Sequence, residues 1–221
     1  MRPLILTTFC ISLLVSTNLC AESDRINNAA VHLQSIDMDL DMDGTVRETH
    51  FNTFGFGFRN QLTSRLDAAI LFGYLFVSQY SNPIPAAQSS SGGYIGFDLR
   101  GHLVATEKFN LHTRFTYRYA DTVSREAEQK ISWEWHEIEL SLESQTYISE
   151  SLFANFSISY LDMDGQETAT GDLNQRLVFD QIDSLTAHIG LQLNLDQSGR
   201  IVFELMTGSM QGGKIVFMRD F

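Results

Sequence analysis

The stretch that decides the fold is the last one in the sequence, Gly212 to Phe221, which reads GGKIVFMRDF. Successive side chains of a β-strand point to opposite faces, so residues two apart share a face. One face of this stretch would carry Phe221, Arg219, Phe217 and Ile215, and the other Asp220, Met218, Val216 and Lys214. The stretch therefore predicts a strand at the chain end, whose aromatic face needs a partner strand and an apolar solvent.

This ending resembles the closing strand of Gram-negative outer-membrane β-barrel proteins, which typically finish on Phe with apolar residues at alternating positions before it. Arg219 departs from that pattern, because the position two before the terminal Phe is usually apolar or aromatic. At the end of a barrel its side chain could snorkel to the membrane interface. The resemblance implies location in the cell outer membrane, contact with outer-membrane lipid, and recognition of the C-terminal strand by barrel assembly machinery.

Residues 1–21 have the pattern of a secretory signal peptide. Arg2 is followed by an apolar run from Leu4 to Val15, and we expect cleavage after Ala21. The run is too short for a transmembrane helix. Cys20 suggests a lipoprotein, but Leu19 stands where a lipobox has a small residue, so we expect no lipidation. The prediction is a signal peptide at 1–21 and one barrel domain at 22–221.

The composition of the expected mature chain narrows its class. Both cysteines, Cys10 and Cys20, lie in the signal segment, so a packed core or a membrane must hold the domain together without disulfides. Removing 1–21 takes away Arg2 and no acid, and the net charge goes from −12 to −13. Such an acidic chain is a poor match for the phosphates of nucleic acid, and we expect no nucleic-acid partner.

Apolar and polar residues alternate along the rest of the chain, whereas helical periodicity is hard to find. Strands are expected at 27–42, 45–60, 66–80, 93–105, around 111–119, around 133–143, at 152–161, in a run that ends at 195, around 201–205 and in the closing stretch. In the first of these, Val31 and Leu33 share one parity and Ile36, Met38 and Leu40 the other, which needs a bulge or a shorter strand. The fold class predicted is all-β, a single antiparallel up-and-down transmembrane β-barrel of about ten strands, with eight or twelve as alternatives.

The connections between these strands alternate in length. Tight turns are expected at 61–65, 106–108 and 196–199, and longer polar loops at 81–92, 121–130 and 162–174. Bacterial outer-membrane barrels have short periplasmic turns and longer outer loops. The pattern therefore places both chain ends at the periplasmic side.

The two faces of the strands differ in a way that favours a membrane barrel over a soluble one. Phe54, Phe56 and Phe58 alternate with Gly55 and Gly57, which suits a lipid-facing wall with something close behind it. Trp133 and Trp135 are expected at a membrane interface, where Trp and Tyr collect. The residues expected to point into the lumen, where carboxylates and guanidiniums can pair, are Asp98, Arg100, Arg114, Arg118, Glu137, Glu139, Glu143 and Glu204.

The pentapeptide LDMDG occurs twice, at Leu40 to Gly44 and at Leu161 to Gly165, each time at the expected end of a strand. The first copy resembles the start of an EF-hand calcium loop, but His50 occupies the place of the closing Glu. We interpret the copies as hairpin turns with solvated acids. The alternative is that these acids bridge divalent cations at the outer leaflet. No metal or cofactor is predicted.

The histidines are His32, His50, His102, His112, His136 and His188, and sequence spacing shows no nucleophile beside a base. We therefore predict no catalytic residues and no enzyme activity. The expected function is that of a small outer-membrane barrel with a polar lumen, in a structural, surface-interaction or narrow-channel role. One alternative is a lipid- or peptide-processing enzyme, which needs a His and a Ser or carboxylate within hydrogen-bond reach near the outer rim. Another is a soluble periplasmic lipocalin-like binding barrel with an apolar interior and a wet outside. The oligomeric state stays open.

Overall fold

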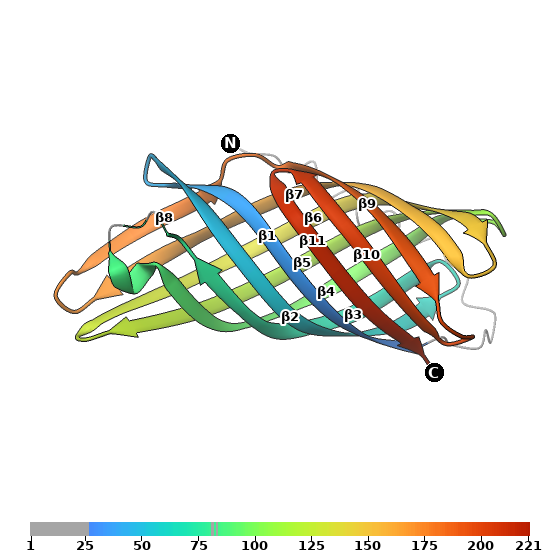
Figure 1. Cartoon of the computed structure of the whole chain (residues 1–221), viewed down its shortest axis with the longest axis horizontal. Helices are drawn as coiled ribbons and strands as arrows, with labels where there is room; N and C mark the ends of the chain where they lie inside the picture. The colour runs from blue at the N-terminus through green and yellow to red at the C-terminus, as the bar shows by residue number, and fades with distance from the viewer. Residues whose placement is uncertain (1–26, 81, 83) are drawn as a thin grey trace.

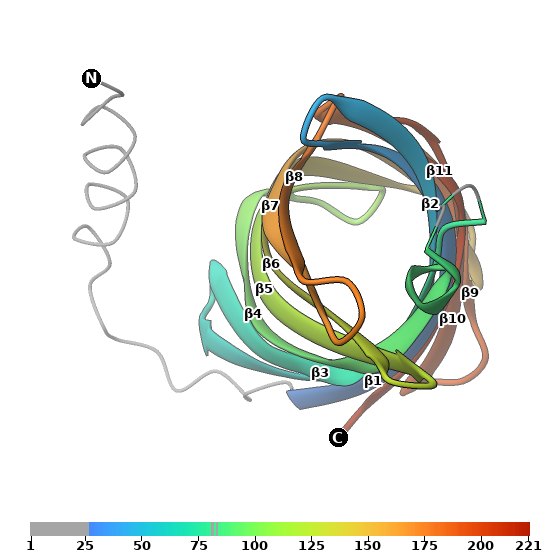
Figure 2. The same ribbon diagram turned by 90° about the vertical axis from the view of Figure 1, so that its left-hand side faces the viewer.

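The alternating segments form one antiparallel sheet that closes on itself (Figure 1, Figure 2). The structure is a computed structural model, which describes residues 27–80, 82 and 84–221, so the predicted signal peptide lies outside the described residues. The elements are β1 (Asn27–Met42), β2 (Thr45–Thr63), β3 (Leu66–Ser78), η1 (Pro85–Ala87), β4 (Ser89–Ala105), β5 (Phe109–Glu126), β6 (Gln129–Ser149), β7 (Leu152–Thr170), β8 (Gln175–Gln181), β9 (Leu185–Asn194), β10 (Gly199–Gly208) and β11 (Met210–Asp220). Among the described residues, no helix has the length and hydropathy needed to cross a membrane.

The closing strand occupies the place that the sequence predicts for it. Strand β11 pairs with β10 on one side and with β1 on the other, so that Val31 lies opposite Phe217. The backbone N–H of Phe221 donates to the carbonyl oxygen of Asn27 at 2.9 Å. The C-terminus and the start of β1 therefore share one end of the barrel, which we call the lower end (Figure 1, right).

The ring has different strand numbers at its two ends. Strands β8 and β9 follow each other along the same edge of β7. The part of β7 from Asp164 upward pairs with β8, and the part from Tyr160 downward pairs with β9. Leaving β8 out of the eleven strands gives a lower ring of ten, as the sequence predicts. Above the short β10–β11 hairpin, β8 reaches across to β1, and the ring there consists of β1 to β8.

Most strands are longer than a membrane requires. Six of them, β1, β2 and β4 to β7, have 16 to 21 residues. A tilted strand needs only about 9–11 residues to span a bilayer. The barrel therefore has a part that lies within the apolar layer and a part that extends beyond it.

The side chains divide the barrel into two zones at one level. On β7, Phe156, Ile158 and Tyr160 are exposed on the outer surface, and the next outward residues are Asp162 and Asp164. The same switch occurs on β6 between Ile138 and His136, and on β2 between Phe54 and Asn52. The lower zone thus has an apolar outer belt, and the upper zone has a polar outer surface.

The interior switches in the opposite sense at the same level. On β6, Glu139 and Glu137 point inward in the lower zone, and Trp135 and Trp133 follow them in the upper zone. The buried core is correspondingly gathered in the upper zone: it includes Ile36, Met38, Leu40, Met42, Phe51, Leu75, Val77, Ile131, Trp133, Trp135, Leu161, Met163 and Phe179. We call this core the plug.

The zones correct the prediction of a bulge or a shortened strand in the first element. Strand β1 pairs with β2 from Asn27 to Met42 without a register shift. Ile36, Met38 and Leu40 point into the plug, and the outward positions between them are acidic. The apolar residues change parity along β1 because the lower zone has its apolar side chains outside and the upper zone has them inside.

The predicted outer loops are wrong in extent for the same reason. Strand β5 continues to Glu126 and β7 to Thr170, so that 121–126 and 162–170 are paired strand. The β5–β6 connection is a tight turn with Ala127 at φ 53°. Polar residues on the outer surface of the upper zone have the composition of a loop, although on β7 they alternate with the buried apolar residues Leu161, Met163 and Ala169.

The predicted position of the two tryptophans is also wrong. Trp133 and Trp135 do not lie at a membrane interface, since both are only 1% exposed and face inward. They share the parity of Glu137 and Glu139 and continue the inner face of β6 into the plug. The aromatic residues at the upper edge of the outer belt are instead tyrosines and phenylalanines, including Tyr74, Phe76 and Tyr160.

Candidate functional site

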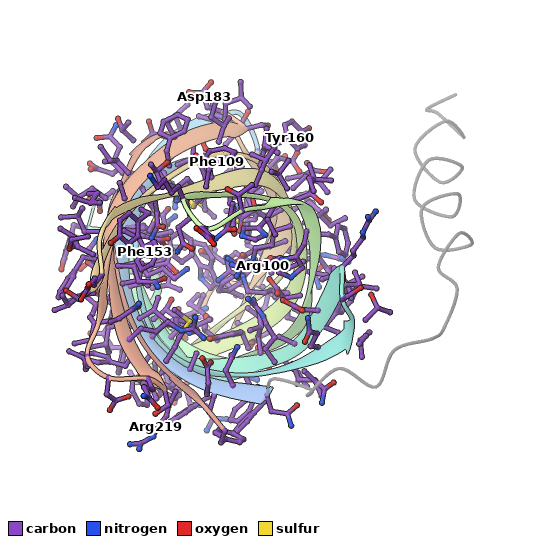
Figure 3. All side chains as sticks on the ribbon, turned by 90° about the vertical axis from the view of Figure 1, so that its right-hand side faces the viewer. Arg100, Phe109, Phe153, Tyr160, Asp183 and Arg219 are labelled. Atoms are coloured by element: carbon purple, nitrogen blue, oxygen red, sulfur yellow. The ribbon has the colours of Figure 1, made fainter. Side chains whose placement is uncertain are left out.

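The lower zone encloses a polar cavity of about 430 Å³. In the view from the lower end, Arg100 points into the ring, and Arg219 lies outside it (Figure 3). The cavity is lined by charged, amide, hydroxyl and imidazole side chains of β1 to β7 and β9 to β11, together with apolar side chains that include Leu71, Val202, Met206, Val216 and Met218. All of the predicted lumen residues are found facing inward: Asp98, Arg100, Arg114, Arg118, Glu137, Glu139, Glu143 and Glu204.

Asp98 on β4 is the centre of the charge network. Its carboxylate is fully buried and accepts from Arg59 Nη2 at 2.6 Å, from Arg114 Nε, and from Thr116 Oγ1 at 3.3 Å. Arg114 also reaches Glu143, at 3.4 Å, and so bridges two carboxylates. Because every bond joins different strands, the network fixes the wall across its width.

Further pairs keep the charge of the cavity balanced. Arg100 donates to Glu143 at 2.8 Å, and His102 lies 2.9 Å from Asp67. Arg118 pairs with Glu137, Arg200 with Asp220, and Lys214 lies 3.5 Å from Glu204. Cations and carboxylates therefore neutralise one another, and the cavity presents no field of a single sign to a ligand.

The expectation that something lies close behind the glycines of β2 is confirmed. The Tyr94 hydroxyl and His32 Nε2 are 2.8 Å apart in the lumen. A Cβ at Gly55 would collide with both side chains. Gly55 is thus required by the close approach of this hydrogen-bonded pair.

The plug forms the ceiling of the cavity. Trp135 meets Phe51 edge-on, with ring centroids 5.9 Å apart, and Trp133 lies 5.2 Å from Phe179. Trp135 Nε1 donates to Glu137 Oε1 at 2.8 Å, which ties the ceiling to the charge network. The pocket between the zones has only about 20 Å³, room for about one water molecule. Buried apolar side chains thus occupy the lumen above the cavity.

Glu167 on β7 is an acid inside the plug, opposite Trp133. Its side chain is 1% exposed, and Oε2 has no hydrogen-bond partner among the described residues. Burial raises the pKa of this carboxyl, and the guanidinium of Arg47 opposes the rise. Glu167 therefore favours its protonated form more than a solvated Glu does.

The histidines divide between the two sides of the wall. His32, His102, His112 and His188 line the cavity. His188 Nε2 is 2.9 Å from Ser159 Oγ, beneath the plug. His50 and His136 lie on the outer surface: His136 contacts the Tyr117 hydroxyl at 2.7 Å, and His50 contacts Asp37 at 2.6 Å.

Only one LDMDG copy is a turn. Asp43 and Gly44 have φ of 54° and 85°, as in a type I′ hairpin, and Gly44 N–H donates to Asp41 Oδ1 at 2.7 Å. The second copy lies within β7, with Leu161 and Met163 in the plug, so its prediction as a turn is wrong. In the described part of the chain, no three His, Cys, Asp or Glu are grouped as metal ligands.

The comparisons with known proteins agree with this architecture. No protein-family model matches the chain, and no curated protein matches it. Among solved structures, the outer-membrane protease OmpT from Escherichia coli is 8% identical with a TM-score of 0.52, covering 92% of this chain and 99% of its own. This chain has the fold of an outer-membrane β-barrel. The translocator domain of the autotransporter NalP from Neisseria meningitidis shares that fold, with 11% identity, a TM-score of 0.52, and coverage of 98% of this chain and 95% of its own.

The outer-membrane β-barrel fold and the apolar belt together agree with the predicted location in the bacterial outer membrane. In such barrels the lipid-facing band is about 25 Å tall. The lower zone supplies that band, and the polar outer surface of the upper zone suits water.

Proposed function

We propose that this outer-membrane β-barrel is a closed barrel of the structural or surface-interaction type and does not conduct solutes. Its lower end faces the periplasm, and its upper zone stands above the outer leaflet. The observation that carries the proposal is the plug, which fills the ring of β1 to β8 with buried apolar side chains. We do not favour a narrow-channel role, because buried apolar side chains around Trp135 lie between the cavity and the upper end.

The outer surface of the upper zone supports a role at the cell surface. Asp37, Asp39 and Asp41 of β1 point outward, and Asp180 of β8 lies beside Asp41 and Asp164. Closely spaced acids on paired strands repel one another unless water or a partner compensates them. A rigid acidic wall above the membrane is suited to contact with cationic partners.

We also propose how the closing strand β11 takes part in assembly of the barrel. Outer-membrane lipid covers the belt, and barrel assembly machinery engages β11 through its terminal residues. Phe217 and Phe221 point outward on β11, as does Arg219 between them. This proposal is supported by the alternation of side chains in the closing stretch, which places its phenylalanines on the lipid-facing side.

Conductance tests the closed state. The purified protein, refolded in detergent and added to a planar lipid bilayer, is expected to give no stepwise current, because the plug leaves no aqueous path. A general porin added to the same bilayer is the positive control. The folded state is checked beforehand by the shift of the gel band on boiling. Reproducible single-channel steps from the folded protein would contradict the proposal.

A further inference from the structure

A hydroxyl, an imidazole and a carboxylate form a connected row on the outer wall. Asp37 and Ser35 point outward from β1, and His50 points outward from β2 directly opposite Asp37. His50 Nδ1 is 2.6 Å from Asp37 Oδ1, and His50 Nε2 is 3.4 Å from Ser35 Oγ. The carboxylate thus holds one ring nitrogen while the other faces the hydroxyl.

This connectivity matches the roles that nucleophilic ester chemistry requires. A carboxylate on Nδ1 fixes the tautomer in which Nε2 is unprotonated and can accept the proton of a serine hydroxyl. The Ser–His distance is long for a hydrogen bond, but such contacts are often loose without substrate and tighten when it binds. In the described residues, Ser35 is the outward serine that lies within reach of a carboxylate-bound histidine.

The row lies where the outer surface changes from apolar to polar. Directly below Ser35 on the same face are Leu33 and Phe54, which pair with each other across β1 and β2. Directly above are Asp39 and Glu48. In a bilayer, acyl chains would lie against the apolar residues and the ester linkage of a lipid would lie at the level of Ser35.

The wall beside Ser35 has room for such an ester. Its neighbour on β11 is Gly213, which has no side chain, and Leu205 of β10 stands exposed beyond it. On the other side, Asn52 lies directly opposite Ser35, and cross-strand neighbours have Cβ atoms about 4.5–5.5 Å apart. Asn52 is therefore our candidate donor to the oxyanion that forms on the ester carbonyl when Ser35 attacks it.

We propose that Ser35, His50 and Asp37 are the catalytic triad of a hydrolase that cleaves acyl esters of lipids at the outer face of the membrane. The prediction of no enzyme activity rests on sequence spacing, and this triad is assembled only by pairing β1 with β2. The geometry supports the alternative of a lipid-processing enzyme.

The reaction proceeds in two halves. Ser35 Oγ attacks the ester carbonyl carbon while His50 Nε2 takes the hydroxyl proton, and Asp37 remains ionised beside the imidazolium. The tetrahedral intermediate then breaks the bond to the alcohol oxygen, which receives that proton from His50. Water attacks the acyl-serine with His50 again as the base, which releases the fatty acid and returns the proton to Ser35.

The test uses the full barrel refolded in phospholipid vesicles, with fatty-acid release as the readout. We expect hydrolysis of a long-chain acyl ester, and a fall of about 10³-fold or more in Ser35→Ala and His50→Ala. Vesicles of phosphatidylethanolamine and micelles of lipopolysaccharide are assayed separately, because both carry acyl esters and the active one identifies the source.

A fluorophosphonate probe gives a second readout that does not depend on the lipid. It should label Ser35 in the wild-type barrel, should fail to label Ser35→Ala, and should react far more slowly with His50→Ala. Ser159→Ala is the matched control, because Ser159 also contacts a histidine but lies inside the lumen. It should behave as the wild type in both assays. A folded wild-type barrel that neither hydrolyses either lipid nor takes up the probe would overturn the proposal, as would full activity in Ser35→Ala.

Discussion

Trp135→Ala is expected to lower the free energy of unfolding by about 3–5 kcal/mol, the range for truncating a large buried aromatic residue. Trp135 is 1% exposed and packs edge-on against Phe51. Its removal opens a cavity in the plug and also leaves Glu137 without the donor at 2.8 Å. The measurement is urea unfolding of the barrel in lipid vesicles. The chain has two tryptophans, so Trp133 remains as a single fluorescent probe within the plug.

Tyr160→Ala is the matched control for this substitution. Tyr160 is an aromatic residue of the outer belt, at the level of the border between the zones, and it is 47% exposed. Its loss removes contact with lipid but leaves the interior packed, so the expected destabilisation is well under half of that for Trp135→Ala. Equal losses in the two variants would mean that Trp135 stands at an interface and that the upper zone has no core.

Asp98→Asn is expected to destabilise the barrel by about 3 kcal/mol, because removing one partner of a buried ion pair leaves the other charge uncompensated. Asp98 is fully buried and pairs with both Arg59 and Arg114. The amide preserves the shape of the side chain, so the loss reports the charge. The measurement is the same urea unfolding in vesicles.

Two further variants separate the network from a general effect of lumen charge. Glu204→Gln breaks the looser pair with Lys214, at 3.5 Å and partly exposed, and should cost about 1 kcal/mol or less. Adding Arg59→Met to Asp98→Asn should recover part of the loss, because it removes one uncompensated cation. If Asp98→Asn unfolds like the wild type, the ion pairs at Asp98 do not hold the wall.

The lower zone could be predicted from the sequence because most of its positions follow one rule, apolar outside and polar inside, with Val202, Val216 and Met218 as inward exceptions. That rule places Asp98 and Glu143 in the lumen, and the resemblance of the chain end to the closing strand of outer-membrane barrels agrees with the pairing of β11 with β1. The two glycines of β2 indicate close neighbours, which are Tyr94 with His32 at Gly55 and Leu71 at Gly57.

The upper zone could not be predicted by that rule, because its outer surface is polar and its interior is apolar. An apolar interior and a wet outside are the features expected of a soluble barrel, and they occur here above the membrane. The sequence of β1 contains a sign of this reversal. Acidic residues continue the outward-facing positions of Leu33, and Met38 and Leu40 occupy the inward-facing ones. The length of the strand expected at 27–42 was a second signal, because 16 paired residues exceed what a bilayer requires.

The candidate triad was beyond sequence reasoning for a different reason. Ser35 and Asp37 are two apart on one strand, but His50 reaches them only through the register of the hairpin at Asp43 and Gly44. A slip of one residue would turn His50 to the other side of the wall. Catalytic geometry of this kind depends on register, which the alternation of residues alone does not fix.

The most direct test of the two-zone barrel is labelling of single cysteines on intact cells with a membrane-impermeant maleimide. The two cysteines of the sequence, Cys10 and Cys20, lie in the predicted signal peptide, so we expect the mature barrel to contain no thiol of its own. Ile158→Cys and Asp164→Cys lie on the outer face of β7, below and above the border between the zones. We expect rapid labelling at Asp164 and none at Ile158 until the protein is denatured. Equal labelling of both positions, or labelling of Asp164 only after the outer membrane is broken, would contradict the account.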